Sequence, residues 1–368
     1  MKLFRFVTLH PAGTNVDLMK DEGQIPYTLC CNYPIEAEIV ACHIDKKNAN
    51  ITAVSGLKVK HIPYIVNNAL SGLFYLIFNS KKIDWLNIYF AGRQAYIWTK
   101  IFKTLNHRGK VYLKLDMDFR SSDLYDRDNR ERKIFYKCTD VVDLVSVESE
   151  ALKNRIQKYS SKEIYVIGNG ISKPDFNPIT NQARSNTFLT VARLGTKQKA
   201  TDILLQGFAK TANKHNWNLV LIGTIEEEFK KYIDKFFKEY PELKGRIQFL
   251  GQINDRKQLY NEYCKAKVFV LPSRWESYGI SCAEAISCGC SLILTNSIPP
   301  AKEMTNCEKY GRIIEANNVD DLADALLEAT KKKYTEKETN EMVEYANKQF
   351  SWNEICAKLY TYMMNSGE

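Results

Sequence analysis

The sequence lacks several features that would assign it to a specialised class of protein. No uninterrupted apolar run approaches the ~20 residues that span a bilayer; the longest is "ALSGLFYLIF" at residues 69–78. The opening "MKLFRFVTLH" turns polar too early for a signal peptide, so we expect a buried first strand there. No short-period repeat is visible, which argues against a solenoid. These absences favour a cytoplasmic protein without a membrane span.

Histidine is scarce, and cysteine does not stand in a metal-binding pattern. The chain has 5 His and 10 Cys. Cys282, Cys288 and Cys290 cluster, but no further Cys or His stands beside them at zinc-ligand spacing. In a chain of this length without an export signal, we expect reduced thiols. A 45% hydrophobic and 26% charged composition argues against disorder, and 368 residues favour two domains.

Positive charge is concentrated in the first half of the chain. Residues 1–173 carry 26 Lys and Arg against 18 Asp and Glu, whereas residues 174–368 carry 26 against 25. Residues 46–115 hold twelve basic residues and a single acid, Asp84. The aromatic residues of that segment include Trp85, Tyr96, Trp98 and Phe102. If these aromatics are exposed, the face would bind an anionic membrane surface. The alternative is that they lie in the core and the lysines only solvate the domain.

Strand-like apolar segments alternate with amphipathic helical segments along the whole chain, which predicts an α/β fold with doubly wound parallel sheets. In the first half we expect strands within 3–9, 37–44, 86–90, 110–115, 143–149 and 163–171. The segment "SKPDFNPITNQARSN" (172–186) is rich in Pro, Asn and Ser and is the predicted linker. The rhythm then restarts, so we place one domain at 1–173 and another at 174–351. A C-terminal helix at about 352–368 would return to the first domain.

The segment "LPSRWESYGISCAEAISCG" (271–289) has the residues of a phosphate-binding strand–loop–helix corner. We expect a helix to begin near Gly279, where free N–H groups and the helix dipole favour phosphate. Glu284 then lies roughly 7 Å along the axis, which suits a ribose diol. Glu276 precedes the helix on the side where the sugar of a nucleotide-sugar would lie. The pair would therefore bracket one donor molecule.

This corner resembles the Glu-x7-Glu motif of retaining GT-B glycosyltransferases of the GT4 family (glycosyltransferase group 1). The resemblance implies two Rossmann-like domains facing a cleft, with a C-terminal helix crossing back to the first. It implies that Glu276 contacts the donor sugar near the reacting centre and that Glu284 binds the ribose. It also implies that backbone groups around Tyr278 and Gly279 meet the diphosphate and sugar.

Two further segments resemble the same family. In "TVARLGTKQKATDILLQGF" (190–208), Arg193 and Lys199 occupy the positions of diphosphate-binding cations, and Ala200 stands where many members have glycine. Fixed cations would neutralise the departing phosphate without a metal ion. In "IQFLGQINDRKQLY" (247–260), the backbone near Gln252 and Ile253 would read the base.

The first domain offers weaker candidates for acceptor contacts. Gly13 stands alone where the family often has a glycine pair, and His10 ends the first strand. "VYLKLDMDF" (111–119) ends in Asp116-x-Asp118, a pattern by which metal-dependent GT-A transferases hold a cation. In a GT-B layout Asp116 would instead orient acceptor or donor hydroxyls.

The resemblance therefore implies transfer of a sugar from a nucleoside-diphosphate sugar, with UDP favoured, to a glycan or lipid-linked acceptor with retention of configuration. Polysaccharide biosynthesis is the expected setting. We expect no cofactor, no metal and no nucleic-acid partner, and an association with the inner face of the membrane. The alternatives are a sugar-nucleotide epimerase of related fold, a metal-dependent transferase using Asp116 and Asp118, a nucleic-acid-binding module, and an inactive relative that only binds nucleotide.

Overall fold

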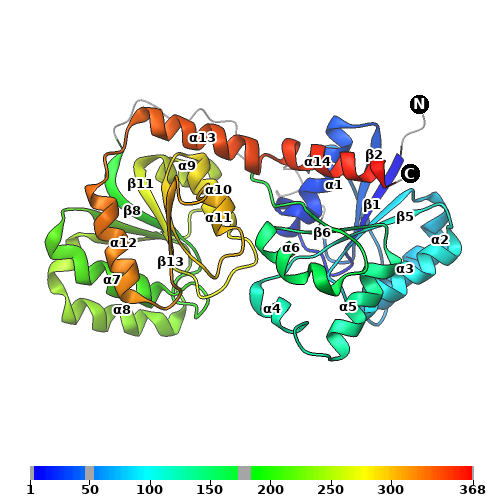
Figure 1. Ribbon diagram of the computed structural model, residues 1–368, viewed down its shortest axis with the longest axis horizontal. Coiled ribbons are helices and arrows are strands. Elements are labelled where there is room, and N and C mark those ends of the chain that lie inside the picture. The colour runs from blue at the N-terminus through cyan, green and yellow to red at the C-terminus, as the bar shows by residue number, and fades with distance from the viewer. Residues whose placement is uncertain (1–3, 46–53, 173–183, 367–368) are drawn as a thin grey trace. The chain divides into compact units, whose positions relative to one another are not determined.

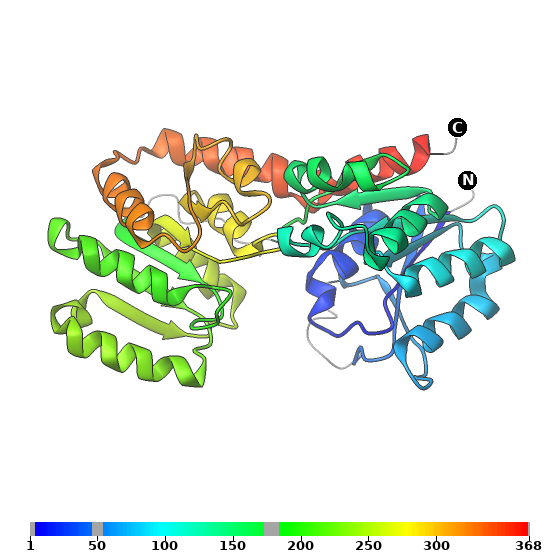
Figure 2. The ribbon, with the colours of Figure 1, turned by 60° about the horizontal axis from the view of Figure 1, so that its bottom comes forward.

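The computed structural model describes residues 4–45, 54–172 and 184–366, and the chain divides into two compact units (Figures 1 and 2). Unit 1 comprises Met1–Ser172 with Phe350–Glu368, and unit 2 comprises Lys173–Gln349. The predicted linker falls mostly on residues 173–183, which lie outside the described residues.

Unit 1 is built on a seven-stranded parallel sheet in the order β3-β2-β1-β4-β5-β6-β7. This is the doubly wound order, in which the chain leaves β1 first to one side and later to the other. The strands are β1 (Phe4–Leu9), β2 (Ile35–Ala41), β3 (Lys58–His61), β4 (Trp85–Tyr89), β5 (Lys110–Lys114), β6 (Leu144–Val147) and β7 (Ile164–Val166).

Helices cover both faces of the first sheet (Figure 1). Strand side chains alternate between the two faces: Val7 joins the core beneath α2, α3, α5 and α6, while Phe6 joins the core beneath α1 and α14. The helices are α1 (Asp21–Asn32), α2 (Asn68–Asn79), α3 (Arg93–Leu105), α4 (Phe119–Asp123), α5 (Arg130–Val141), α6 (Glu150–Ile156) and α14 (Trp352–Asn365).

Unit 2 repeats the doubly wound plan with six parallel strands in the order β10-β9-β8-β11-β12-β13. The strands are β8 (Ser185–Val191), β9 (Asn218–Ile222), β10 (Ile247–Gly251), β11 (Ala266–Leu271), β12 (Ser291–Thr295) and β13 (Gly311–Ile314). The helices are α7 (Thr201–Thr211), α8 (Glu227–Glu239), α9 (Arg256–Lys265), α10 (Ile280–Ser287), α11 (Ala301–Met304), α12 (Val319–Lys331) and α13 (Glu336–Phe350). The predicted fold class, two Rossmann-like α/β domains, is thus confirmed.

The C-terminal segment forms two helices rather than one continuous helix. α13 ends at Phe350, and Ser351 adopts an extended backbone whose side chain accepts a hydrogen bond from the N–H of Asn353 to cap α14. α14 packs on α1, where Ile355 and Leu359 enter the unit 1 core. The last helix therefore returns to the first unit, as expected.

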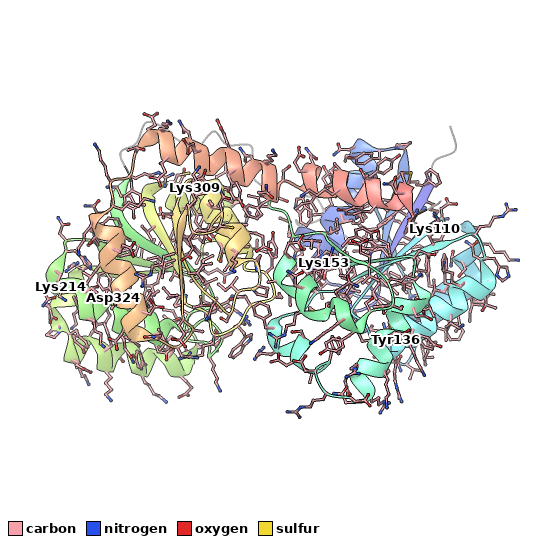
Figure 3. The ribbon with its side chains drawn as sticks, in the orientation of Figure 1. Lys110, Tyr136, Lys153, Lys214, Lys309 and Asp324 are labelled. Carbon is pink, nitrogen blue, oxygen red and sulfur yellow. The ribbon has the colours of Figure 1, made fainter. Side chains whose placement is uncertain are left out.

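The aromatics predicted to form an exposed membrane face are mostly buried, so that expectation was wrong. Trp85, Trp98 and Phe102 are at most 4% exposed, and Tyr96 is half-buried against the same core. Trp98 also donates its indole N–H to the carbonyl of Ala69, 3.0 Å away, which locks α3 against α2. The core interpretation holds for these side chains. Figure 3 shows the described side chains of both units.

Within the described part of the chain, no helix has the length and apolar character needed to cross a membrane.

Candidate functional site

The predicted corner lies at the switch point of the second sheet. β8 and β11 are neighbours at the centre of that sheet, and the chain departs from them in opposite directions. Ligands of doubly wound sheets bind at this point, outside the carboxyl ends of the strands. The loops after these two strands carry Arg193, Lys199 and Glu276. The sheet order thus brings together residues that lie about 80 positions apart in the sequence.

Glu276 is buried among fixed donors. Its carboxylate forms an ion pair with Lys199 and accepts hydrogen bonds from the Ser273 hydroxyl, at 2.7 Å, and from the Gln198 amide, at 3.3 Å. Its side chain is 7% exposed and that of Lys199 is 15% exposed. Three donors from two loops therefore orient this carboxylate before any ligand binds. Sequence reasoning missed Gln198 and Ser273, because their roles depend on the pairing of the two loops.

The loop that carries Lys199 is held by several contacts with the corner. The Gln198 carbonyl accepts a hydrogen bond from the N–H of Arg274 at 2.8 Å, and the Arg274 guanidinium pairs with Asp202 of α7 at 2.7 Å. Arg193 is exposed, with its guanidinium 3.4 Å from the Gln198 amide oxygen. Lys199 thus has a fixed backbone, and Arg193 is free to reach a ligand.

The backbone conformation at Ala200 shows why glycine is common at this position in the family that the segment resembles. The Ala200 backbone is left-handed, with φ +50° and ψ +41°, a conformation that side chains with a Cβ disfavour. The residue caps the start of α7, and its methyl group is fully buried in the unit 2 core. The less typical residue therefore keeps the loop geometry.

α10 begins without a side-chain cap. Gly279 precedes it with φ +89°, which favours glycine, and among the described residues no side-chain cap bonds the first N–H groups. The Tyr278 side chain is buried, so it is the backbone here that can meet a ligand. The first turn contains no acidic residue. The helix start therefore presents the partial positive charge that binds phosphate groups.

Glu284 lies one turn into α10 and is buried between two donors. Arg256, at the start of α9, donates to one carboxylate oxygen at 2.7 Å, and Tyr263 donates to the other at 2.9 Å. Burial, together with the Glu284 charge, raises the pKa of Tyr263 far above its usual value, so the phenol stays protonated. Each carboxylate oxygen can accept a further hydrogen bond. Sequence reasoning missed Arg256 and Tyr263.

The predicted base-reading segment leads directly into this cluster. Gln252 and Ile253 follow β10, and three residues later Arg256 reaches Glu284. Gln252 is exposed, and its amide donates to Asn254 at 2.8 Å. The structure therefore places this loop beside the predicted ribose contact.

The unit 1 candidates lie at the carboxyl end of the first sheet. His10 follows β1, and its ring meets Tyr89 of β4 edge-on, with centroids 5.9 Å apart. Burial lowers the pKa of His10, which favours the neutral ring. The Gly13 N–H donates to the His10 carbonyl at 2.8 Å, and a Cβ at Gly13 would lie 2.6 Å from the His10 ring. The single glycine therefore permits a tight turn around His10.

The Asp116-x-Asp118 pair is divided between two structural settings. Asp118 caps α4 by accepting from the N–H of Ser121 at 2.7 Å, and it also pairs with Arg120 at 2.8 Å. Asp116 is half-buried at the end of β5. Among the residues that the structure describes, no group of three or more His, Cys, Asp or Glu is arranged to hold a metal ion.

A buried lysine network near Asp116 was not predicted. Lys114, at the end of β5, is fully buried, and its ammonium lies 2.7 Å from Glu148, 3.0 Å from Asn169 and 3.2 Å from Asp21. Burial disfavours its charge, but Asp21 and Glu148 more than offset this and raise the pKa of Lys114. The network fixes the start of α1 and the ends of β5 and β6. A lysine inside an apolar strand was its only signal in the sequence.

Comparisons with known proteins place unit 2 in a family. Residues 172–349 match the family described as Glycosyl transferases group 1. An "uncharacterized glycosyltransferase" of Methanocaldococcus jannaschii, MJ1178, is 25% identical over 309 residues, which is 83% of this chain and 82% of that protein. A "probable sucrose-phosphate synthase" of Thermosipho melanesiensis is 25% identical over 202 residues, which is 54% of this chain and 46% of that protein.

Solved structures resemble the whole chain. Anabaena Alr3699/HepE in complex with UDP has a TM-score of 0.74 at 15% identity, covering 99% of this chain and all of that one. The lipopolysaccharide outer core galactosyltransferase WaaB has a TM-score of 0.74 at 16% identity, covering 99% of each chain. At such identities the likeness shows the fold alone. Unit 2 therefore carries a glycosyl transferases group 1 domain, within a chain whose two Rossmann-like units match the GT-B fold.

Proposed function

We propose that this protein transfers a sugar from a nucleoside-diphosphate sugar, with UDP favoured, to a glycan or lipid-linked acceptor with retention of configuration. One observation carries the proposal: Glu276 and Glu284 are both buried, each is paired with a cation, and they bracket the uncapped start of α10. The family match of unit 2 and the glycosyltransferase from M. jannaschii support it. The fold relative that binds UDP supports the choice of nucleotide.

In this proposal the donor diphosphate lies at the start of α10, where Arg193 and Lys199 supply positive charge. Lys199 exchanges Glu276 for a phosphate oxygen, and Glu276 then accepts hydrogen bonds from sugar hydroxyls. Glu284, oriented by Arg256, accepts from the ribose hydroxyls. Hydroxyl donors suit both acids, because a carboxylate is a hydrogen-bond acceptor only. A nucleotide-sugar supplies hydroxyls on both sides of its diphosphate.

The reaction is a front-face displacement. The acceptor oxygen attacks the anomeric carbon as the bond to the phosphate oxygen breaks, and the acceptor proton passes to the departing diphosphate. Negative charge grows on the leaving group, so fixed cations stabilise the transition state more than the ground state. Arg193, Lys199 and the helix start do this without a metal ion. In unit 1, His10, Gly13 and Asp116 are the proposed acceptor-side contacts.

A donor panel tests the proposal. Purified protein is mixed with UDP-, GDP- and ADP-sugars in EDTA, and thermal shift and donor hydrolysis are measured. One sugar nucleotide should give both signals, and NMR of the product should show the anomeric configuration of the donor. Lys199→Ala should reduce the thermal shift at a fixed nucleotide concentration, whereas the matched control Lys197→Ala, an exposed lysine of the same loop, should not. No shift with any nucleotide overturns the proposal, and conversion of the donor without an acceptor identifies an epimerase.

We further propose that the acceptor is lipid-linked and that unit 1 associates with an anionic membrane surface, as in polysaccharide biosynthesis. The exposed apolar side chains of unit 1 are not those expected from the sequence. They include three on α2, Phe74, Ile77 and Phe78, of which Phe78 is 76% exposed. These three lie at i, i+3 and i+4, so they share one face of the helix. Two exposed lysines, Lys81 and Lys82, follow. Apolar side chains beside cations suit the headgroup boundary.

Vesicle co-sedimentation tests the membrane claim. Binding should appear with anionic vesicles, fall with salt and vanish with neutral lipid. Phe74→Ser with Phe78→Ser should weaken it, whereas Leu250→Ser, at an exposed leucine of unit 2, should not. Absence of binding at low salt would overturn the membrane claim and leave a soluble acceptor.

A further inference from the structure

A hollow of about 680 Å³ lies between α3 and α5 on the outer face of unit 1. α3 contributes Arg93 and Ile97, and α5 contributes Arg130, Lys133 and Lys137. These two helices pack side by side next to α2 on one face of the sheet (Figure 1). The hollow is separate from the residues predicted to contact donor or acceptor.

The hollow has a surplus of unpaired positive charge. Its only acid is Asp128, whose carboxylate lies 3.8 Å from Lys133. Within the described part of the chain, Arg93, Arg130 and Lys137 make no ion pair. Their charge is therefore available to an anion, and Arg130 and Arg93 can each bind phosphate through two N–H groups.

The wall of the same hollow is apolar. Tyr96 and Ile134 are half-buried against the unit 1 core, and Ile97 is 48% exposed. α3 starts beside the hollow at Gly92, with no side-chain cap on its first N–H groups. A ligand that suits both the free cations and the apolar wall carries a phosphate and an adjoining hydrocarbon segment.

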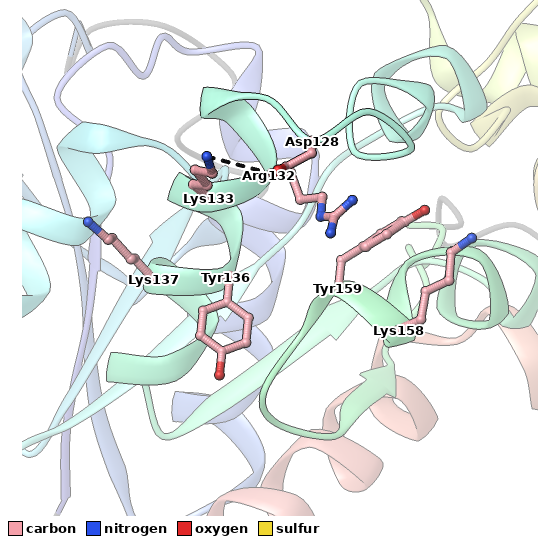
Figure 4. Close-up of a pocket in the computed structure, with 7 residues that line it drawn as sticks. All are labelled: Asp128, Arg132, Lys133, Tyr136, Lys137, Lys158 and Tyr159. Carbon is pink, nitrogen blue, oxygen red and sulfur yellow. Dashed lines mark ion pairs between the residues drawn. The ribbon is translucent and has the colours of Figure 1, made fainter.

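A neighbouring hollow along α5 provides an internal comparison. A second hollow of about 520 Å³ shares Asp128, Lys133 and Lys137 with the first, and its further lining includes Arg132, Lys158 and Tyr159 (Figure 4). Arg132 lies over the Tyr159 ring at 5.4 Å, and Lys158 lies 3.7 Å from Asp126. These cations already have partners inside the protein. The two hollows therefore share Lys133 and Lys137 and differ in their other cations: Arg132 and Lys158 have partners, whereas Arg93 and Arg130 make no ion pair among the described residues.

We propose that the α3–α5 hollow binds one lipid molecule through its phosphate group. That group is a phosphomonoester or a diphosphate on a hydrocarbon chain. The phosphate lies among Arg93, Arg130, Lys133 and Lys137, and the first carbons of the chain lie on Ile97. The role of this site in presenting a lipid-linked acceptor rests on the proposed function, but its binding does not require catalysis. The site differs from the α2 face in being saturable by one molecule.

Calorimetric titration with a monomeric short-chain lipid tests the proposal. Dihexanoyl phosphatidic acid, below its micelle concentration, should bind the full-length protein at one site. Dihexanoyl phosphatidylcholine should not bind, and pyrophosphate should bind more weakly. If pyrophosphate binds as tightly as the lipid, the site takes free phosphate and the lipid proposal is overturned. Absence of saturable binding overturns it entirely.

Matched variants locate the site. Arg93→Ala with Arg130→Ala should weaken lipid binding roughly tenfold or more. Arg132→Ala with Lys158→Ala removes the same charge from residues that line only the second hollow and should have little effect. Equal losses would overturn the assignment. Ile97→Ser should weaken the lipid but not pyrophosphate. The UDP-induced thermal shift should survive in every variant, which separates failure of this site from failure of the proposed function.

Discussion

Replacing Glu276 with glutamine should strengthen UDP binding, although it should impair sugar transfer. In the structure the Glu276 carboxylate holds Lys199 as an ion pair that is largely shielded from water. Lys199 must leave this carboxylate to reach a phosphate. Glutamine keeps the size, and its one carbonyl oxygen can still accept from Ser273, although its NH2 group replaces the oxygen that accepts from Gln198. Glutamine removes the charge that retains the lysine. It also removes the repulsion between a carboxylate and the diphosphate.

The magnitude follows from the kind of hydrogen bond that is lost. A hydrogen bond to a charged group contributes about 1.5–3 kcal/mol, and one between neutral groups contributes about 0.5–1.5 kcal/mol. The difference, about 1 kcal/mol, corresponds to roughly fivefold tighter binding of UDP. UDP carries no sugar, so the contact between Glu276 and sugar hydroxyls does not enter this balance. The intact donor does use the contact with Glu276, so Glu276→Gln should lower the affinity for the donor in comparison with the affinity for UDP.

Isothermal titration with UDP measures the effect. Glu276→Gln should lower the Kd, whereas Glu284→Gln should raise it, because a ribose contact is lost. Lys199→Ala should raise the Kd by roughly 10- to 150-fold, and the control Lys197→Ala should leave it unchanged. If Glu276→Gln weakens UDP binding, or if the two lysine variants behave alike, the exchange of Lys199 between carboxylate and phosphate is refuted.

Four further predictions concern kinetics, backbone, pH and metal. Steady-state assays should show that Glu284→Ala mainly raises the donor KM and Glu276→Ala mainly lowers kcat, since contacts near the sugar tighten as charge develops; equal small effects would refute these roles. Ala200→Gly should change the free energy of unfolding by less than about 1 kcal/mol, because relief of the left-handed backbone is offset by a lost buried methyl and a more flexible unfolded chain. Burial raises the pKa of Glu22 to about 9, so the folded state keeps a proton that the unfolded state loses above its ordinary pKa near 4.5; the urea midpoint should therefore fall as pH rises from 5 to 9, and Glu22→Gln should flatten that fall. Asp118→Ala should lower stability by about 1 kcal/mol through the lost helix cap without changing turnover in EDTA; loss of turnover in EDTA and its recovery with magnesium would favour the metal-dependent alternative.

Much of the fold could be predicted because local patterns and tertiary structure agree. The strand–helix alternation matches the observed elements over most of unit 2, and Gly279 lies at a positive φ as the corner motif requires. The predicted start of the last helix, at about 352, agrees with α14, which begins at Trp352 after the capping hydroxyl of Ser351. β3 was missed because its four residues carry little hydrophobic pattern.

Exposure of aromatic side chains could not be read from composition. α3 has one buried face, so Trp98 and Phe102, spaced by four, are both inside. α2 is apolar around much of its surface, and the sequence therefore does not indicate that Phe74 and Phe78 face solvent. Which face is covered depends on the neighbouring helices. The charge asymmetry was visible in the sequence, but the exposure of the apolar side chains on α2 was not.

Under the proposed function, the ion pairs of Glu276 and Glu284 would give the donor site a selectivity that the motif alone does not explain. In the structure Glu276 and Glu284 each neutralise a cation, so a bare phosphate would gain Lys199 only by leaving a buried carboxylate without its charged partner. A nucleotide-sugar offers hydroxyl donors to both carboxylates while its diphosphate takes Lys199 and the start of α10. Charge and hydrogen bonds are then satisfied together. In the proposed function the carboxylates would therefore disfavour ligands that bring phosphate without hydroxyls on both sides. Such specificity is built by unfavourable as well as favourable contacts.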